Sequence, residues 1–278
     1  MPKLSGKAVR ADGVQPERWL AVLHGIYGAG RNWGAVVRAL VGERPDWGAV
    51  LIDLRQHGES MGFESPHTLA GAAADLDAVG SGSASDWGAG SFGAVLGHSF
   101  GGKVALVRAA EDPGIRQVWV VDSTPEARDP EGGAWDMLAS LRRLPATFED
   151  RDAAVAALEA EGVAHAVALW MTTNLAWRKD RYEWSLDLDD MEALLLDFFR
   201  TDLWPVVEEP REGLEIHFIR ATGSRVLSAE AVGRIRAAGE GSGRVFLHDV
   251  QGGHWLNVDN PDAVIALLAR HLPGDGSP

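Results

Sequence analysis

A serine in a glycine-rich turn is the strongest candidate for chemistry in this sequence. Ser99 lies in the string Gly-His-Ser-Phe-Gly at 97–101, after an apolar run typical of a buried strand at 92–96 and before a run of helical periodicity. Such a tight strand-to-helix turn strains its central residue, and glycines two positions away on each side leave room for it. The free N–H groups of the next helix would favour negative charge near Ser99. We therefore take Ser99 as the candidate nucleophile; a plain turn with a bystander serine is the alternative.

A serine hydroxyl needs a base that accepts its proton, and a neutral imidazole is the usual one. Nine histidines are present, and His254 is the best placed of them. It follows the last expected strand, at 245–250, and precedes the last expected helix, so it should emerge at the carboxyl edge of the sheet together with Ser99. A solvated loop histidine is the alternative interpretation. His98 is the neighbour of Ser99, and we expect its side chain to point away from the site.

A carboxylate must hold the second imidazole nitrogen and stabilise the imidazolium that forms. Asp122 follows the expected strand at 118–121, which is the strand after the one that leads to Ser99. The expected strand that ends at Ile219 is followed by no Asp or Glu until Glu230. Asp122 is therefore the candidate acid. If it were only a turn aspartate that bonds to its own backbone, Glu230 or Asp249 would take its place.

An oxyanion formed during acyl transfer needs N–H donors already in position. Phe100 follows the nucleophile and can supply one backbone donor. Ile26, in the turn after the first long expected strand, is the candidate for the second. Another strand ends in the charged turn at 53–60, and we interpret that turn as a loop stabilised by local hydrogen bonds instead of a ligand site.

The composition narrows the classes of partner. Lys and Arg number 26 against 40 Asp and Glu, which gives a formal net charge of −14, and no cysteine occurs. The surface therefore repels phosphate backbones, so no nucleic-acid partner is expected, and disulfides and thiol nucleophiles are excluded. No window approaches the ~18 apolar residues of a membrane span, and no apolar run follows the basic start of the chain, so we expect a cytoplasmic protein. No motif indicates a metal or a dinucleotide, so no cofactor is expected.

Apolar runs that alternate with helical periodicity predict an α/β fold, with a mostly parallel sheet flanked by helices. The alternation breaks near residue 122 and resumes near 214, and the stretch between has helical patterns but no convincing strand. We expect a core formed by 1–124 and 212–278, with a helical cap at 125–211. Expected strands lie at 19–23, 49–54, 92–96, 118–121, 215–219 and 245–250, and expected core helices at 32–41, 68–79, 101–111, 229–238 and 261–271.

Four strings together resemble the α/β-hydrolase superfamily over nearly all of the chain outside the cap: those at 23–33, 53–60, 97–103 and 253–255. Their closest resemblance is to the YbfF-like acyl esterases. The resemblance implies an α/β-hydrolase fold whose cap is inserted after the sixth strand. It also implies an acid on the earlier strand, with Ser in place of the late Asp, and Ser224 and Asp122 fit this pattern. Phe100 stands where that group often has Met.

These features predict a serine hydrolase that cleaves small-molecule carboxylic esters or thioesters, without a cofactor. The same triad could instead hydrolyse carbon–carbon bonds, open lactones or form peracids, and a ligand receptor built on this fold is the alternative from another class. Large apolar rings predict a pocket for small to medium apolar acyl groups. The pocket residues that we expect are Tyr27, Trp135, Trp170, Trp177 and Trp255.

Overall fold

The computed structural model describes residues 2–80 and 92–274. The stretch at 80–93 is rich in Gly and Ser, which predicts a loop between two elements, and most of it lies outside the described residues. A seven-stranded sheet forms the centre of the core, in the order β1-β3-β2-β4-β5-β9-β10. All neighbouring strands are parallel except β1, which pairs antiparallel with β3 at one edge. The strands are β1 (Gly6–Val9), β2 (Arg18–Leu23), β3 (Trp47–Ile52), β4 (Ala94–His98), β5 (Gln117–Val121), β9 (Glu215–Ala221) and β10 (Val245–Val250).

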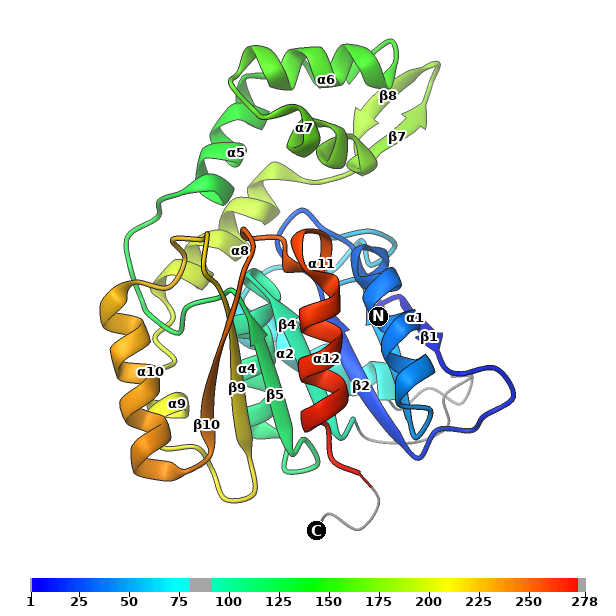
Figure 1. The fold of residues 1–278 in the computed structure, drawn as a ribbon. Coiled ribbons are helices and arrows are strands. Elements are labelled where there is room, and N and C mark those ends of the chain that lie inside the picture. Colours follow the sequence, from blue (N-terminus) through cyan, green and yellow to red (C-terminus); the bar gives the residue numbers. More distant parts are fainter. Residues whose placement is uncertain (1, 81–91, 275–278) are drawn as a thin grey trace.

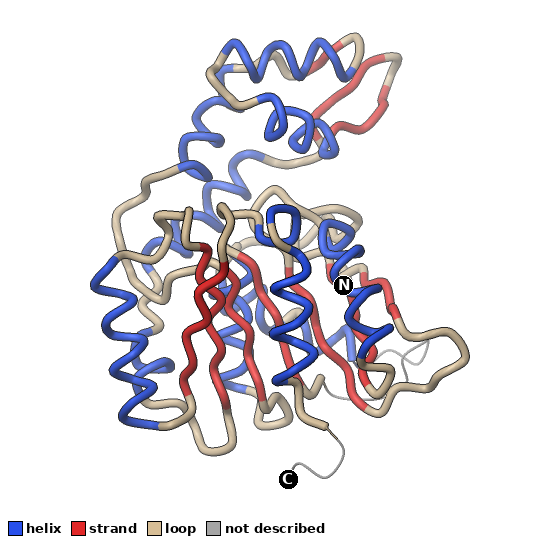
Figure 2. Tube along the Cα trace, in the orientation of Figure 1, coloured by secondary structure: helices blue, strands red, loops and turns tan. Residues whose placement is uncertain are grey.

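Helices cover both faces of this sheet, as Figure 2 shows. The central strands are largely apolar because alternate side chains enter opposite cores: in β2, Leu20 and Val22 pack on one side, and Ala21 and Leu23 on the other. One layer contains the short η1 (Gly30–Trp33), α1 (Gly34–Glu43), α11 (Leu256–Asp259) and α12 (Pro261–His271). The other contains α2 (Leu69–Ala74), α3 (Leu76–Gly80), α4 (Phe100–Glu111), α9 (Trp204–Glu208) and α10 (Ala229–Ser242).

The segment assigned to the cap lies over the edge of the sheet at which the parallel strands end (Figure 1). It follows β5, the fifth strand of the chain and not the sixth. Its apolar side chains join the same core cluster as α4 and α10, so the cap is packed onto one face of the core. The elements are α5 (Gly133–Arg143), β6 (Thr147–Phe148), α6 (Arg151–Ala160), α7 (His165–Met171), η2 (Thr172–Asn174), β7 (Leu175–Arg178), β8 (Arg181–Trp184) and α8 (Leu188–Arg200).

The expectation of a purely helical cap is wrong, because β6, β8 and β7 form a small antiparallel sheet. Its β7–β8 hairpin turns at Lys179 and Asp180, whose φ angles are 47° and 65°. Two positive φ angles characterise a two-residue hairpin turn, for which Asn-Gly is the usual signal. Lys-Asp gives no such signal, so the sequence pattern does not predict this hairpin.

One buried lysine connects the core to both ends of the cap. Lys103 of α4 is fully buried, and its Nζ donates to the backbone oxygens of Glu126, Phe198 and Thr201, each at 2.7 Å. Glu126 lies before the cap helices, and the other two lie at the end of α8. Three acceptors require three N–H donors, which only the ammonium form supplies. Burial lowers the pKa of Lys103 to about 7, and the nearby charge of Arg128 acts in the same direction.

Candidate active site

The turn that carries Ser99 has the strained geometry that its sequence predicts. Ser99 joins β4 to α4 with φ 52° and ψ −117°, and its backbone N–H donates to the Val121 oxygen at 3.0 Å. A Cβ at Gly97 would lie 2.0 Å from the Gly101 oxygen, and one at Gly101 would lie 2.5 Å from the His24 oxygen. Both positions therefore require glycine, since a side chain at either would push the turn apart. The hydroxyl of Ser99 is held at the rim of the sheet.

His254 and Asp122 meet although 132 positions separate them in the sequence. His254 Nδ1 lies 2.7 Å from Asp122 Oδ2, and Asp122 is fully buried. The other carboxylate oxygen accepts the N–H of Ala221 at 3.2 Å. Because Nδ1 faces a carboxylate, it carries the proton and Nε2 is the basic nitrogen. His254 and Ser99 line the same cavity, so the candidate base and the candidate nucleophile face one space.

The two other acids considered from the sequence lie elsewhere. Glu230 is exposed in the first turn of α10. Asp249 lies on β10 and accepts hydrogen bonds from Arg220 and Arg236 at the surface. After the end of β9, Ser224 Oγ accepts the N–H of Val226 at 3.2 Å, so this serine stabilises the loop that follows the strand. Of the three carboxylates considered, the structure brings only Asp122 to His254.

The expectation that His98 points away from the site is wrong. Its ring lies 4.7 Å from that of His254, and its Nε2 is 2.8 Å from the His254 backbone oxygen. Burial, reinforced by the charge of His254, lowers the pKa of His98 to about 3. The neutral ring therefore donates Nε2–H to that carbonyl and positions the His254 loop. The position of His98 next to Ser99 is the one sequence feature that could have indicated this contact. A strand pattern alone does not predict which loop the side chain of His98 contacts.

The oxyanion turn is fixed by a second buried histidine. The N–H of Tyr27 donates to His57 Nε2 at 3.1 Å, and the N–H of Gly28 donates to the Gly25 oxygen at 3.0 Å. Within the described chain, the N–H of Ile26 has no hydrogen-bond partner. The N–H of Phe100 lies in the first turn of α4, where helix donors are free. The two candidate donors are therefore available for a ligand oxygen.

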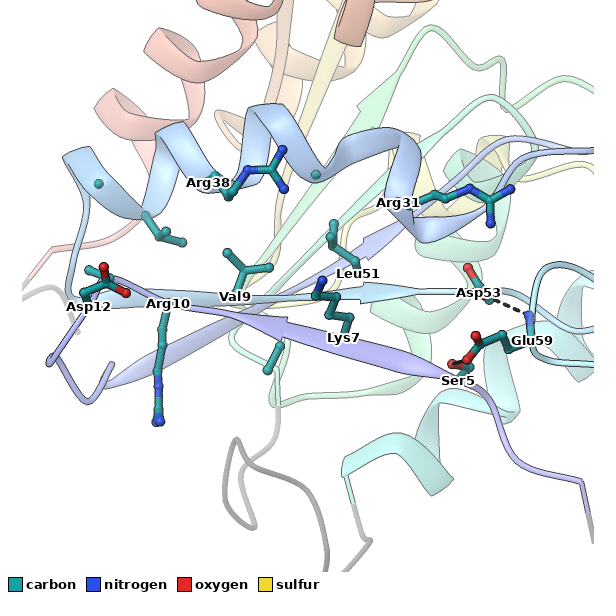
Figure 3. A pocket seen from close by; sticks show the side chains of 15 residues that line it. Ser5, Lys7, Val9, Arg10, Asp12, Arg31, Arg38, Leu51, Asp53 and Glu59 are labelled. Atoms are coloured by element: carbon teal, nitrogen blue, oxygen red, sulfur yellow. Dashed lines mark hydrogen bonds between the residues drawn. The ribbon is translucent and has the colours of Figure 1, made fainter. Parts of the chain in front are cut away.

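The turn at 53–60 makes the local hydrogen bonds expected of a structural loop. Asp53 accepts the N–H groups of Gly30 and Glu59, the second of which is drawn in Figure 3. Arg55 pairs with Asp75 through two hydrogen bonds. A surface groove of about 770 Å³ lies between β1 and α1, and Asp53 borders it. Figure 3 shows the side chains that line this groove. Ser99 and His254 do not line this groove, so it is separate from the candidate site.

A cavity of about 920 Å³ lies between the core rim and the cap. Tyr27, Trp170 and Trp255 line it, and the two tryptophan rings lie 5.5 Å apart, one from α7 and one beside α11. The assignments of Trp135 and Trp177 to the pocket are corrected. Trp135 packs edge-on against Phe199, whereas Trp177 is 57% exposed on the hairpin. The number of tryptophans in the cap does not show which of them lie on a face that lines the cavity, so the sequence could not distinguish Trp170 from Trp135 and Trp177.

The described residues contain no helix that is long and apolar enough to cross a membrane. Within the same ranges, no group of three or more His, Asp or Glu side chains is arranged to hold a metal ion.

Comparison with known proteins agrees with this geometry. The family model described as "Alpha/beta hydrolase family" matches residues 20–267, which includes every element that carries the site. The chain belongs to the alpha/beta hydrolase family. The strained turn between β4 and α4 lies within the matched residues.

Individual relatives of this alpha/beta hydrolase are distant. A sn-1-specific diacylglycerol lipase ABHD11 from Xenopus tropicalis is 24% identical over 171 residues, which are 59% of this chain and about half, 52%, of that protein. A marine microorganism esterase superposes with a TM-score of 0.80 at 21% identity, covering 98% of this chain and all of the other. The thioesterase domain from the curacin biosynthetic pathway gives 0.66 at 16% identity, covering 95% and 99%. The solved structures share the fold.

Proposed function

We propose that this alpha/beta hydrolase is a serine hydrolase that cleaves carboxylic esters or thioesters of small to medium apolar acyl groups. The observation that carries the proposal is the 2.7 Å contact between His254 Nδ1 and the buried Asp122 carboxylate, beside a cavity that Ser99 also lines. The esterase and lipase names among its relatives support ester chemistry. Asp122 and Ser224 also support a place near the YbfF-like acyl esterases.

The proposed reaction passes through an acyl-enzyme. Ser99 Oγ attacks the carbonyl carbon while its proton passes to His254 Nε2, and Asp122 stabilises the imidazolium. The N–H groups of Ile26 and Phe100 hold the oxyanion, and each such donor contributes a factor of about 10²–10³ in turnover. His254 then gives its proton to the leaving alkoxide or thiolate. Water attacks the acyl-enzyme with His254 again as base, which releases the acid and restores Ser99.

A fluorophosphonate probe tests the nucleophile directly. Wild-type protein should be labelled, and Ser99→Ala should not be, because the probe forms its bond with an activated serine. Ser140→Ala is the control, since Ser140 is a buried serine of α5 that does not line the cavity, and its loss should not affect labelling. Labelling that persists in Ser99→Ala would remove Ser99 from its role.

A series of p-nitrophenyl esters tests the reaction and the acyl preference. Butyrate and hexanoate should be hydrolysed faster than acetate, because a longer chain buries more apolar surface in the cavity. Steady turnover supports an enzyme, whereas a single stoichiometric burst without turnover favours a receptor on the same fold. Equal rates for acetate and hexanoate would contradict the apolar pocket.

A further inference from the structure

The wall of the candidate active-site cavity combines apolar side chains with two arginines. Its cap side carries apolar side chains such as Met137, Val167 and Leu195. Arg128 and Arg225 also line it, on the connections that follow β5 and β9. An apolar substrate alone gives no reason for two guanidinium groups in this wall.

These two connections lie side by side. β5 and β9 are neighbouring parallel strands, and Asp122 after β5 accepts the N–H of Ala221 at the end of β9. Farther along, Ser228 Oγ donates to Glu126 Oε1 at 3.4 Å. Because Arg128 follows Glu126 by two positions and Arg225 precedes Ser228 by three, we place both arginines at the same end of the cavity.

Polar atoms at this end lack protein partners. The Nε of Arg128 is buried and has no hydrogen-bond partner among the described residues, and its guanidinium lies over the Phe199 ring at 5.6 Å. Ser123 lines the same cavity, is almost fully buried, and its Oγ is also without a partner in the described chain. Buried polar groups are normally hydrogen-bonded, so a donor and a hydroxyl left open at a cavity point to a ligand that completes them.

The charge around these groups favours an anion. The chain has a formal net charge of −14, which offers many carboxylates. Even so, neither arginine forms an ion pair with any described carboxylate, including Glu131, the acidic residue in the described cavity wall. An arginine fork without a carboxylate matches a planar oxyanion such as a substrate carboxylate.

We propose that Arg128, Arg225 and Ser123 bind a carboxylate on the leaving alcohol or thiol of the substrate. This inference rests on the proposed ester or thioester hydrolysis, which places the apolar acyl group along the apolar cap wall and leaves the cationic end for the other half of the substrate. The substrate class is then an apolar acyl ester or thioester of an anionic alcohol or thiol. Arg128 and Arg225 determine which leaving groups are bound, and Ser99 carries out the bond cleavage.

A matched pair of esters tests the proposal. Hydrolysis of para-carboxyphenyl hexanoate is compared with that of its neutral methyl ester in the wild type, Arg128→Gln and Arg225→Gln. The ratio of kcat/KM for the charged ester to that for the neutral ester should fall about 10- to 100-fold in Arg128→Gln, mainly through KM, because one charge-assisted hydrogen bond is lost. Arg225→Gln, at an exposed position, should lower the ratio in the same direction. Arg38→Gln removes the same charge at the distant groove and should leave the ratio unchanged.

A pair with the carboxylate on the acyl side, p-nitrophenyl hydrogen adipate against p-nitrophenyl hexanoate, locates the anion. A ratio that depends on Arg128 only in this second pair would overturn the assignment to the leaving group. An unchanged ratio in both arginine variants for both pairs would overturn the site itself.

Binding to Ser99→Ala separates this inference from the proposed function, because it needs no turnover. Calorimetric titration with para-hydroxybenzoate should give a Kd at least tenfold weaker when Arg128→Gln is added. Inorganic phosphate, the second probe, should bind more weakly than para-hydroxybenzoate, and the reverse order would overturn the choice of a carboxylate. Arginine-dependent binding in a protein that hydrolyses no ester would refute the proposed function while supporting this site. No difference in Kd between the two proteins would refute the site.

Discussion

The rim of the core sheet and the cap face each other across one cavity, yet they are built in different ways. On the rim, Ser99, Asp122 and His254 each lie within four positions of the end of a strand, and buried hydrogen bonds hold the turns around them. On the cap, the cavity wall is formed by single faces of α5, α7 and α8, together with residues of the connection that precedes α5. In the proposed reaction, the rim positions the reacting groups, whereas the cap supplies most of the apolar wall of the cavity above them.

This difference predicts different responses to change. A substitution on the rim should act on turnover or on the folding of the whole core, because its side chains are buried in connected networks. A substitution on the cap wall should act mainly on KM for particular substrates, because those side chains line the space that the substrate would occupy. The effects below are ordered from the largest to the smallest.

Asp122→Asn should cause the largest loss. The amide can donate to His254 Nδ1 and favour the wrong tautomer, so kcat for p-nitrophenyl butyrate should fall by about 10⁴ while KM changes little. Asp249→Asn removes a carboxylate from a surface ion pair and serves as the control. Wild-type turnover in Asp122→Asn would mean that another group orients the base.

Acidification should destabilise the rim through its buried neutral histidines. Burial lowers the pKa to about 4 for His24 and to about 3 for His57 and His98. The unfolded chain, with histidine near 6.5, binds more protons than the folded chain in this range. Stability is therefore full above about pH 6.5 and falls as the pH drops toward 4, by about 1 kcal/mol per histidine at pH 5.5.

Urea unfolding followed by tryptophan fluorescence at pH 7.5 and 5.5 measures this loss. His165→Gln, which changes an exposed histidine of the cap, should leave the difference between the two pH values unchanged. An equal free energy of unfolding at both pH values would show that these rings are not held neutral by burial.

Lys103→Met should loosen the junction between the two regions. It keeps the apolar stem but leaves three backbone oxygens without their donor, so the free energy of unfolding should fall by about 2–4 kcal/mol. Lys179→Met, in the exposed hairpin turn of the cap, is the matched control. A variant as stable as the wild type in urea would mean that the cap needs no such connection.

Trp170→Ala should have the smallest and most selective effect. It removes the α7 ring that meets Trp255 at the cavity. KM for p-nitrophenyl hexanoate should rise about 3- to 10-fold, because apolar contact with the chain is lost, while acetate hydrolysis should change less. Trp177→Ala removes a tryptophan of the same cap that lies outside the cavity, and its kinetics should match the wild type. If both variants behaved alike, the cavity wall would not set acyl preference.

The sequence by itself determined the fold family and the chemical identity of the rim. Strand ends in a parallel sheet collect at one edge, so a glycine-flanked serine, an aspartate and a histidine that each follow a strand are brought together by topology. The six expected parallel strands form, with shifts of a few positions at their ends. Gly97 and Gly101 are required by close backbone contacts that any strand-to-helix turn of this kind makes. Local pattern is sufficient wherever backbone geometry leaves few alternatives.

Only the tertiary structure decided which side chains of the cap and of the buried network meet the site. Tryptophan content did not distinguish Trp170 from Trp177, since one position on a helix or hairpin faces the cavity and another faces solvent. The contact of His98 with the His254 loop and the span of Lys103 across both ends of the cap join residues far apart in sequence. Long-range packing determines these hydrogen-bond partners of His98 and Lys103, and the local periodicity of the sequence does not predict them.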